Sequence, residues 1–176
     1  MILPIRTLPD SCLKTPSRPV EHVTPQVVRL IHDLIETMRR HPRCVGLAAP
    51  QVGVNLRLAV VDVTRHPKAT RSTGLMVFVN PAITARDGEL VQREGCLSIP
   101  DFTGNVRRAV RVQVTALDEE GRWWTRWLEG FEAIAAQHEL DHLDGTLFLD
   151  RVTSLRTDVF RRKTYWLPTK GSDPLS

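Results

Sequence analysis

The feature that most constrains the fold is the sequence Gln-His-Glu-Leu-Asp-His at residues 137–142. It places His138 and His142 four residues apart in a segment that is predicted to be helical. Side chains at this spacing lie one above the other on a helix, so both imidazoles can reach one metal ion while Glu139 stands beside it. The pattern therefore indicates two metal ligands and a general base.

The surrounding residues predict that this helix is buried. A helix over residues 130–143 places Phe131, Ile134 and Ala135 on the face that carries the histidines, and Gly145 ends it. The alternative is a chance pattern on a charged surface helix, where two exposed histidines would be ordinary. A buried helix argues against chance, because buried polar side chains need partners.

The order of predicted elements indicates an α+β fold. An amphipathic helix starts at Thr24-Pro25 and ends at His41-Pro42, and it is followed by strands over 56–63, 75–80 and 106–117. A turn at 118–121 leads to a strand that contains three tryptophans, and a further helix is predicted over 153–167. We expect antiparallel or mixed sheets packed around a central metal-binding helix, with an N-terminal and a C-terminal helix.

Length and composition predict one catalytic domain over residues 1–168 and a polar tail over 169–176. A chain of 176 residues with 41% hydrophobic residues has enough apolar surface for one core. Three cysteines without framework spacing, no signal-peptide pattern and no long apolar run indicate a cytoplasmic protein with no membrane contact. The sequence does not indicate an oligomeric state.

A third metal ligand is needed, since a catalytic ion usually has three protein ligands and one open position. No histidine or glutamate follows His142, and His22, His32, His41 and His66 lie far upstream. Cys96, in the sequence Glu-Gly-Cys-Leu-Ser at 94–98, is the remaining candidate. Two other interpretations of Cys96 stay open, which are a buried inert cysteine and a nucleophile paired with histidine.

Residues 44–51, with the sequence Cys-Val-Gly-Leu-Ala-Ala-Pro-Gln, form a loop of small residues that suits close backbone approach to a ligand. Together with 94–98 and 137–142, in that order, this loop resembles the peptide deformylase family. The resemblance extends from about residue 2 to about residue 166. It implies an α+β fold, a divalent metal and N-formylmethionyl nascent peptides as substrates, from which the enzyme releases formate.

The residues and the resemblance together give a predicted mechanism. Cys96, His138 and His142 hold the metal, with Fe²⁺ expected in the cell and Zn²⁺, Ni²⁺ or Co²⁺ also compatible with these ligands. Glu139 moves the proton of the attacking water. The resemblance assigns the Gln51 side chain and the Leu97 backbone N–H to the oxyanion. It further implies that the peptide main chain pairs with Val45, Gly46 and Gly95, and that the methionine side chain contacts Phe131, Ile134 and Ala135, for which plain core packing is an alternative.

Two positions depart from the family pattern. Cys44 stands where the pattern has glycine, which adds a thiol near the predicted site. Thr103 stands where many members have arginine, so a charge contact to the peptide is either missing or supplied by Arg107 or Arg108.

Two other functions share some of these features. A zinc endopeptidase has the same histidine motif but normally a ligand downstream of it. A non-catalytic RNA- or ribosome-binding module with a structural metal would account for the basic C-terminal residues, which hold the excess of a net charge of +4. These are Arg151, Arg156, Arg161, Arg162, Lys163 and Lys170. The first five fall in or just before the predicted C-terminal helix, and they indicate either ribosome contact or only a solvated helix face.

Overall fold

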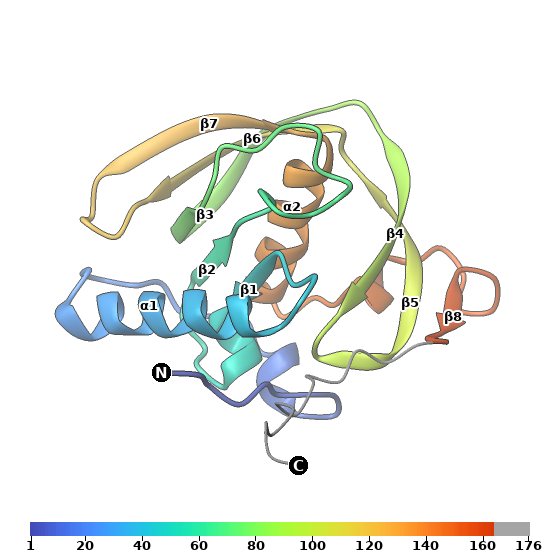
Figure 1. Cartoon of the computed structure of the whole chain (residues 1–176), viewed down its shortest axis with the longest axis horizontal. Coiled ribbons are helices and arrows are strands. Elements are labelled where there is room, and N and C mark those ends of the chain that lie inside the picture. Colours follow the sequence, from blue (N-terminus) through green and yellow to red (C-terminus); the bar gives the residue numbers. More distant parts are fainter. Residues whose placement is uncertain (164–176) are drawn as a thin grey trace, which may run out of the picture.

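The computed structural model describes residues 1–163, and it contains helices and antiparallel sheets in the α+β arrangement that the sequence predicts. Figure 1 shows the helices and strands along the chain. The helices are α1 (Pro25–Arg40), α2 (Gly130–Leu143) and α3 (Phe148–Arg151), with short 3₁₀ turns η1 (Ser11–Lys14) and η2 (Ala49–Val52). The strands are β1 (Gly46–Ala48), β2 (Leu58–Val61), β3 (Met76–Asp87), β4 (Leu90–Cys96), β5 (Ile99–Arg108), β6 (Arg111–Leu117), β7 (Trp123–Glu129) and β8 (Val159–Arg161).

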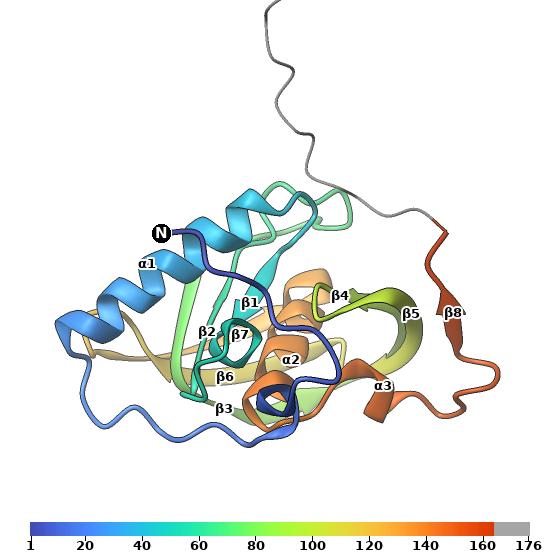
Figure 2. The ribbon, with the colours of Figure 1, turned by 90° about the horizontal axis from the view of Figure 1, so that it is seen from below.

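The strands form two antiparallel sheets with α2 between them. One sheet has the order β1-β2-β3-β6-β7, and the other has the order β4-β5-β8. Figures 1 and 2 both show α2 between β2 and the β4–β5 hairpin, while α1 lies on the outer side of the larger sheet. The central position of α2 brings residues from both sheets within reach of its side chains.

Alternation along β2 explains why the larger sheet packs on both helices. Leu58 and Val60 belong to the apolar cluster that contains the buried face of α1. Ala59 and Val61 belong to the cluster that contains α2. Successive side chains of a strand point to opposite faces, so an unbroken run of apolar residues predicts a strand that is covered on both sides.

The predicted limits of α1 and α2 are confirmed. Thr24 is the N-cap of α1, and its side chain accepts a hydrogen bond from the Val27 backbone N–H at 3.4 Å, with Pro25 at the first helical position. Helix α2 starts at Gly130 and ends at Leu143, as the sequence predicts. Within residues 1–163, no helix has both the length and the apolar character needed to cross a membrane.

The predicted strand over 106–117 is two strands in different sheets. Strand β5 ends at Arg108 in the smaller sheet, and β6 begins at Arg111 in the larger one. The Gln137 side chain bridges the crossing point, since it accepts from the Ala109 N–H at 3.0 Å and donates to the Ala109 carbonyl at 2.9 Å. Because a side chain of α2 satisfies this backbone, the local sequence alone does not reveal the break.

The helix predicted over 153–167 is wrong in the part that the structure describes. Residues 159–161 form β8, which pairs with β5 through Phe102↔Arg161 and Gly104↔Val159. Of the apolar residues that suggested a helical face, Val159 and Phe160 lie in this edge strand, whereas Leu155 is exposed. Residues 164–167 of this prediction, and the polar tail at 169–176, lie outside the described residues.

Candidate metal centre and substrate cleft

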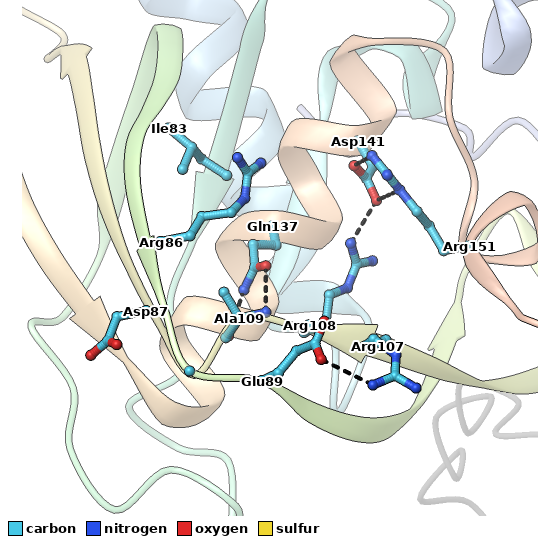
Figure 3. Close-up of a pocket in the computed structure, with 11 residues that line it drawn as sticks. Ile83, Arg86, Asp87, Glu89, Arg107, Arg108, Ala109, Gln137, Asp141 and Arg151 are labelled. Carbon is cyan, nitrogen blue, oxygen red and sulfur yellow. Dashed lines mark hydrogen bonds and ion pairs between the residues drawn. The ribbon is translucent and has the colours of Figure 1, made fainter.

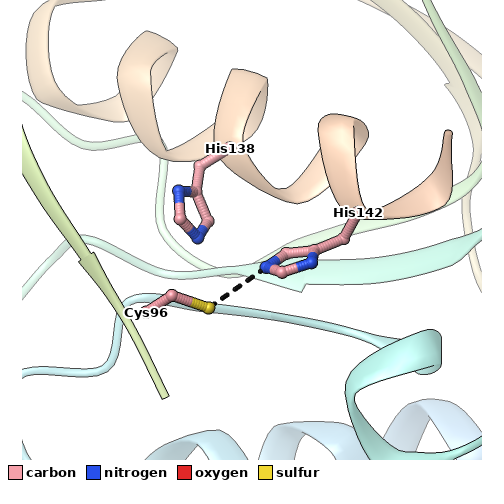
Figure 4. A group of neighbouring side chains, drawn as sticks. All are labelled: Cys96, His138 and His142. Atoms are coloured by element: carbon pink, nitrogen blue, oxygen red, sulfur yellow. Dashed lines mark hydrogen bonds between the residues drawn. The ribbon is translucent and has the colours of Figure 1, made fainter. Parts of the chain in front are cut away.

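Three potential metal ligands converge between the two sheets. Cys96 lies at the end of β4, and His138 and His142 lie one turn apart on α2 (Figure 4). Their candidate ligand atoms all lie within 4.8 Å of one another. The Cys96 Sγ and the His142 Nε2 are 3.3 Å apart. The fold thus brings together the three residues that sequence spacing singles out.

The electrostatics of this group favour a thiolate. Burial raises the pKa of the Cys96 thiol, but the nearby imidazoles of His142 and His138 more than offset burial and hold this pKa well below its usual value. Burial also opposes a charged His138, whereas Cys96 and Glu94 raise the pKa of His138 well above its usual value. A cysteine that carries negative charge is the form that binds a metal.

A buried ion-pair network holds His138 from behind. The His138 Nδ1 lies 2.8 Å from the Glu94 carboxylate, which leaves the other ring nitrogen for a ligand. Arg108 binds both oxygens of Glu94 at 2.6 and 2.9 Å and one oxygen of Asp141 at 2.6 Å. Burial would raise the pKa of Glu94, but Arg108 and His138 lower it to about 2.

Sequence reasoning did not identify the role of this network in holding His138. Glu94 and Asp141 lie within two of the three segments that the family pattern identifies, so their presence there was an available signal. The role of Arg108 could not be seen in the sequence, because it depends on the pairing of β4 with β5. The network links the histidine helix to the cysteine strand through charge-assisted hydrogen bonds.

Glu139 lies in the wall of the cleft and has one free oxygen. Its Oε2 is buried and has no hydrogen-bond partner among residues 1–163. Burial is the main cause that raises the pKa of Glu139, to about 7, against the lowering effect of His138 and His142. The carboxylate lies against Gly46, where any side chain would overlap it. A larger residue at this position of β1 would force the Glu139 side chain to move.

The Gln51 side chain lies next to Cys96. Its Oε1 accepts from the Ala48 N–H at 2.9 Å, which fixes the orientation of the amide. Its Nε2 donates toward the Cys96 Sγ and the Ser98 Oγ, both at 3.3 Å. The amide hydrogens thus point to the place where the metal ligands meet, and Leu97 lies beside them in the chain.

A cavity of about 590 Å³ contains almost all the predicted site residues. Its lining includes Val45, Gly46, Gln51, Gly95, Cys96, Leu97, Phe131, Ile134, Ala135, His138 and Glu139, whereas His142 is not part of this surface. Phe131 stacks on His66 with ring centroids 4.3 Å apart, and Ala135 also packs in the core cluster of α2. The three apolar residues therefore take part in both the cleft wall and the core.

Two strand edges border this cavity. Strand β1 is an outer strand of the larger sheet, and β4 is an outer strand of the smaller one, among the strands of residues 1–163. Gly46 of β1 and Gly95 of β4 both line the cavity. An edge strand presents unpaired backbone groups, so an extended peptide can add to it as a further strand.

The two departures from the family pattern have structural consequences. The Cys44 thiol donates to the Gly46 carbonyl at 3.1 Å, and burial and the nearby Glu139 raise its pKa. The expectation that Arg107 or Arg108 replaces an arginine at 103 is wrong. Arg108 is buried with Glu94 and Asp141, and Arg107 pairs with Glu89 outside the cleft. The cation in this part of the cleft is Arg162, which sequence reasoning placed on a helix, and both Arg162 and Thr103 lie next to the position that a side chain at Gly95 would take.

A second cavity, of about 400 Å³, lies on the other side of α2. Figure 3 shows Gln137 and Asp141 of α2 with Arg107, Arg108 and Arg151 around it. Arg151 donates to Asp141 at 2.7 and 3.1 Å, and Gln137 binds Ala109. Most of its charged groups are thus paired with one another, and none of the three ligand residues lines it.

Comparisons of the sequence with known proteins identify relatives of this chain. The sequence profile of the family described as Polypeptide deformylase matches residues 2–158. A peptide deformylase of Alkalilimnicola ehrlichii is 43% identical over 170 residues, which cover 97% of this chain and 93% of that protein.

Solved structures resemble the fold as well. The crystal structure of a peptide deformylase from Legionella pneumophila has a TM-score of 0.80 and 42% identity, and covers 89% of both chains. The Met-Ala-Ser-bound class I type b peptide deformylase from Acinetobacter baumannii has a TM-score of 0.80 and 33% identity, over 86% of this chain and 99% of that one.

Proposed function

The chain belongs to the polypeptide deformylase family, and we propose that it removes the N-formyl group from the formylmethionine of new polypeptides and releases formate. The observation that carries the proposal is one cleft that joins Cys96, His138, Glu139 and Gln51. The family and the Cys/His/His group make the protein a metal-dependent hydrolase of linear amides.

Cys96, His138 and His142 fit the metal that the family implies. One thiolate and two imidazoles suit iron, zinc, nickel or cobalt, and three protein ligands leave a position for substrate or water. We propose Fe²⁺ as the ion in the cell. When bound, such an ion supplies Lewis acidity, which makes water more acidic and polarises a carbonyl group.

Glu139 is proposed to move the proton. Its carboxylate takes a proton from the water that attacks the formyl carbon, and then delivers that proton to the departing amine nitrogen. The buried and unpartnered Oε2 of Glu139, in the wall of the cleft next to His138, supports this role. In the part of the chain that the structure describes, no other carboxylate that lines the cleft has this freedom, because Glu94 is bound by Arg108 and His138.

Gln51 and Leu97 are proposed to stabilise the oxyanion. The Gln51 Nε2 points at the ligand group, and the Leu97 backbone N–H follows Cys96 directly. Hydrogen-bond donors that are already in place need no reorganisation when negative charge develops on the formyl oxygen. The bond from Ala48 to the Gln51 Oε1 keeps the donor end of the amide directed at the site.

The peptide is proposed to lie as an added strand between β1 and β4. Val45, Gly46 and Gly95 would pair with its main chain, and Phe131, Ile134 and Ala135 would contact the methionine side chain. The two free strand edges and the apolar wall of α2 support this placement. The Met-Ala-Ser peptide bound to the Acinetobacter relative supports methionine as the first residue.

Formate release tests the proposal directly. Purified protein loaded with Fe²⁺ under nitrogen should release one formate for each formyl-Met-Ala-Ser consumed. Acetyl-Met-Ala-Ser and an internal peptide serve as controls, because the first has a larger acyl group and the second tests endopeptidase activity. Absence of formate from a fully metal-loaded protein would overturn the proposed function.

The comparisons give no support to the other two functions. Cleavage of internal peptides would indicate an endopeptidase. A structural metal site needs four protein ligands, whereas the group found within residues 1–163 has three. The free Glu139 carboxylate beside it also fits catalysis better than a structural role.

We propose that the catalytic domain spans residues 1–168 and that the enzyme acts in the cytoplasm, where nascent chains emerge. Contact with ribosomal RNA through the basic C-terminal residues also stays a proposal. Arg156, Arg161 and Lys163 are exposed, so their exchange for Glu should abolish ribosome co-sedimentation at low salt. The matched control is the exchange of Arg29, Arg39 and Arg40 on α1. Equal co-sedimentation of both variants would contradict the contact.

A further inference from the structure

The cleft that holds the ligand group has a cationic rim. Four of its lining residues are Arg43, Lys68, Arg93 and Arg162, and among residues 1–163 its only acidic lining residues are Glu94 and Glu139. Both glutamates are buried, and Glu94 is already bound by Arg108. Arg43, Lys68 and Arg93 are exposed and Arg162 is half-buried, so an anionic group that enters the cleft meets cations.

Arg162 is the cation nearest to the proposed path of the peptide. Its guanidinium lies where a side chain at Gly95 would be, and Thr103 is the register partner of Gly95 on β5. The Arg162 backbone N–H donates to the Asp101 carbonyl at 2.7 Å, which fixes the chain at the end of β8. Its Nε is buried and has no hydrogen-bond partner among residues 1–163. A cation held in this way is available to a ligand.

Arg93 lies close to Arg162 on the same side of the smaller sheet. Arg93 and Gly95 are two residues apart on β4, so they share one face of the strand. The Arg93 guanidinium stacks on Phe160, with its Cζ 3.6 Å from the centroid of the ring. Phe160 precedes Arg162 by two residues. Its Nε donates to the Asn105 Oδ1 at 2.9 Å. These contacts hold the Arg93 guanidinium beside the stretch of β4 where the Arg162 guanidinium also lies.

We propose that Arg162, together with Arg93, selects formylated peptides that carry a carboxylate side chain at the second or third residue. The inference rests on the proposed function. A peptide whose formyl carbon lies near Cys96 and that runs along β4 advances about 3.3 Å per residue. Its second or third residue then passes Gly95 and Arg93, where a carboxylate can accept paired hydrogen bonds from a guanidinium.

The test compares peptides that differ only in charge. Formyl-Met-Glu-Ser is measured against formyl-Met-Gln-Ser, and formyl-Met-Ala-Glu against formyl-Met-Ala-Gln. With the wild-type protein at low salt, kcat/KM for the better Glu peptide should exceed that of its Gln partner by roughly three- to ten-fold, since partly exposed ion pairs are worth a modest free energy. The difference should lie in KM, because the contact is remote from the formyl group.

Arg162→Gln should bring this ratio close to one. The ratio compares two peptides on one enzyme, so a change in folded or metal-loaded fraction cancels. The matched control is Arg107→Gln, which removes an arginine from the cavity of Figure 3 and should retain the wild-type ratio.

Two results would overturn the inference. One is a wild-type ratio near one at both positions, and the other is a ratio that Arg162→Gln leaves unchanged. If no formylated peptide releases formate, the proposed function itself fails. If all four release it at equal rates, only the selectivity fails.

Discussion

Helices α1 and α2 have similar lengths but bury their side chains in different ways. Helix α1 buries one face, with Val27, Ile31, Leu34 and Met38 against the sheet, and leaves its basic end exposed. In α2, eleven of the fourteen residues are buried, and they include Glu132, Gln137, Glu139, Asp141 and His142. Helix α1 therefore supplies apolar surface to the core, whereas α2 carries polar groups into it.

Polar groups inside a protein require partners, and several of those on α2 have specific ones. Gln137 satisfies the backbone at Ala109, and Asp141 binds Arg108 and Arg151. Glu139 and His142 each keep a buried polar atom without a partner among residues 1–163. Unsatisfied buried groups cost stability, so the Glu139 Oε2 marks the place where substrate is expected. In His142 the unpaired atom is Nδ1, whereas the ring atom beside Cys96 is Nε2.

The largest expected difference concerns histidines on the two helices. His138→Ala should abolish both bound metal and formate release, because one of three proposed ligands is lost. His32→Ala on α1 is the matched control, since His32 is exposed and pairs with Glu119 at the surface. Metal content by elemental analysis and formate release measure the two effects. A His138→Ala protein that keeps its metal would contradict the ligand assignment.

Glutamates on the two helices give the next comparison. Glu139→Gln keeps the shape of the side chain but removes the base, so kcat should fall by at least about 10²-fold while metal content stays the same. Glu36→Gln changes an exposed residue of α1 and should leave kcat unchanged. Near wild-type turnover of Glu139→Gln would show that another group moves the proton.

The two helices also show how much of the fold sequence reasoning reaches. The limits of α1 follow from Thr24-Pro25 and one apolar face, and α2 follows from its apolar residues and Gly145. Strands β4 and most of β5 were missed, because β4 contains Gln92, Arg93 and Glu94 and has no clear alternation of apolar residues. Their pairing depends on contacts distant in sequence, as does β8, whose apolar residues fitted a helical face equally well.

The residues of the candidate site likewise fall into some that the sequence predicts and some that it does not. Cys96, His138, His142 and Glu139 were predictable, because ligand chemistry restricts residue type and spacing. Arg108 and Arg162 were not, because each reaches the site only through pairing of β5 with a neighbouring strand. Sequence therefore predicts the groups proposed to do the chemistry better than the groups that hold them in place.

The core face of α1 should affect stability without affecting chemistry. Leu34 is fully buried, so Leu34→Ala should lower the free energy of unfolding by about 2–5 kcal/mol. Its kcat per metal-loaded molecule should stay at the wild-type value well below the melting temperature. Urea unfolding at fixed metal loading measures the first quantity. A large fall in kcat would mean that α1 supports the site as well as the core.

The smallest expected effect concerns how each helix begins. Helix α2 has no side-chain cap and follows β7 directly, and the Gly130 N–H donates to the Val110 carbonyl at 2.9 Å. Tertiary structure thus fixes its first turn. Helix α1 depends on Thr24, whose hydroxyl accepts from the Val27 N–H at 3.4 Å. Because this bond is long, Thr24→Ala should cost about 0.5–1 kcal/mol, at the low end for a lost N-cap.

Urea unfolding of Thr24→Ala and Thr24→Ser measures this contribution. Serine keeps the hydroxyl that accepts the bond, so Thr24→Ser should stay within a few tenths of a kcal/mol of the wild type. Thr24 is exposed, and loss of its methyl group leaves no cavity in the core. Equal destabilisation by both exchanges would show that the hydroxyl contributes nothing. Helix α1 would then owe its start to Pro25 and its packing, and in this respect it would resemble α2.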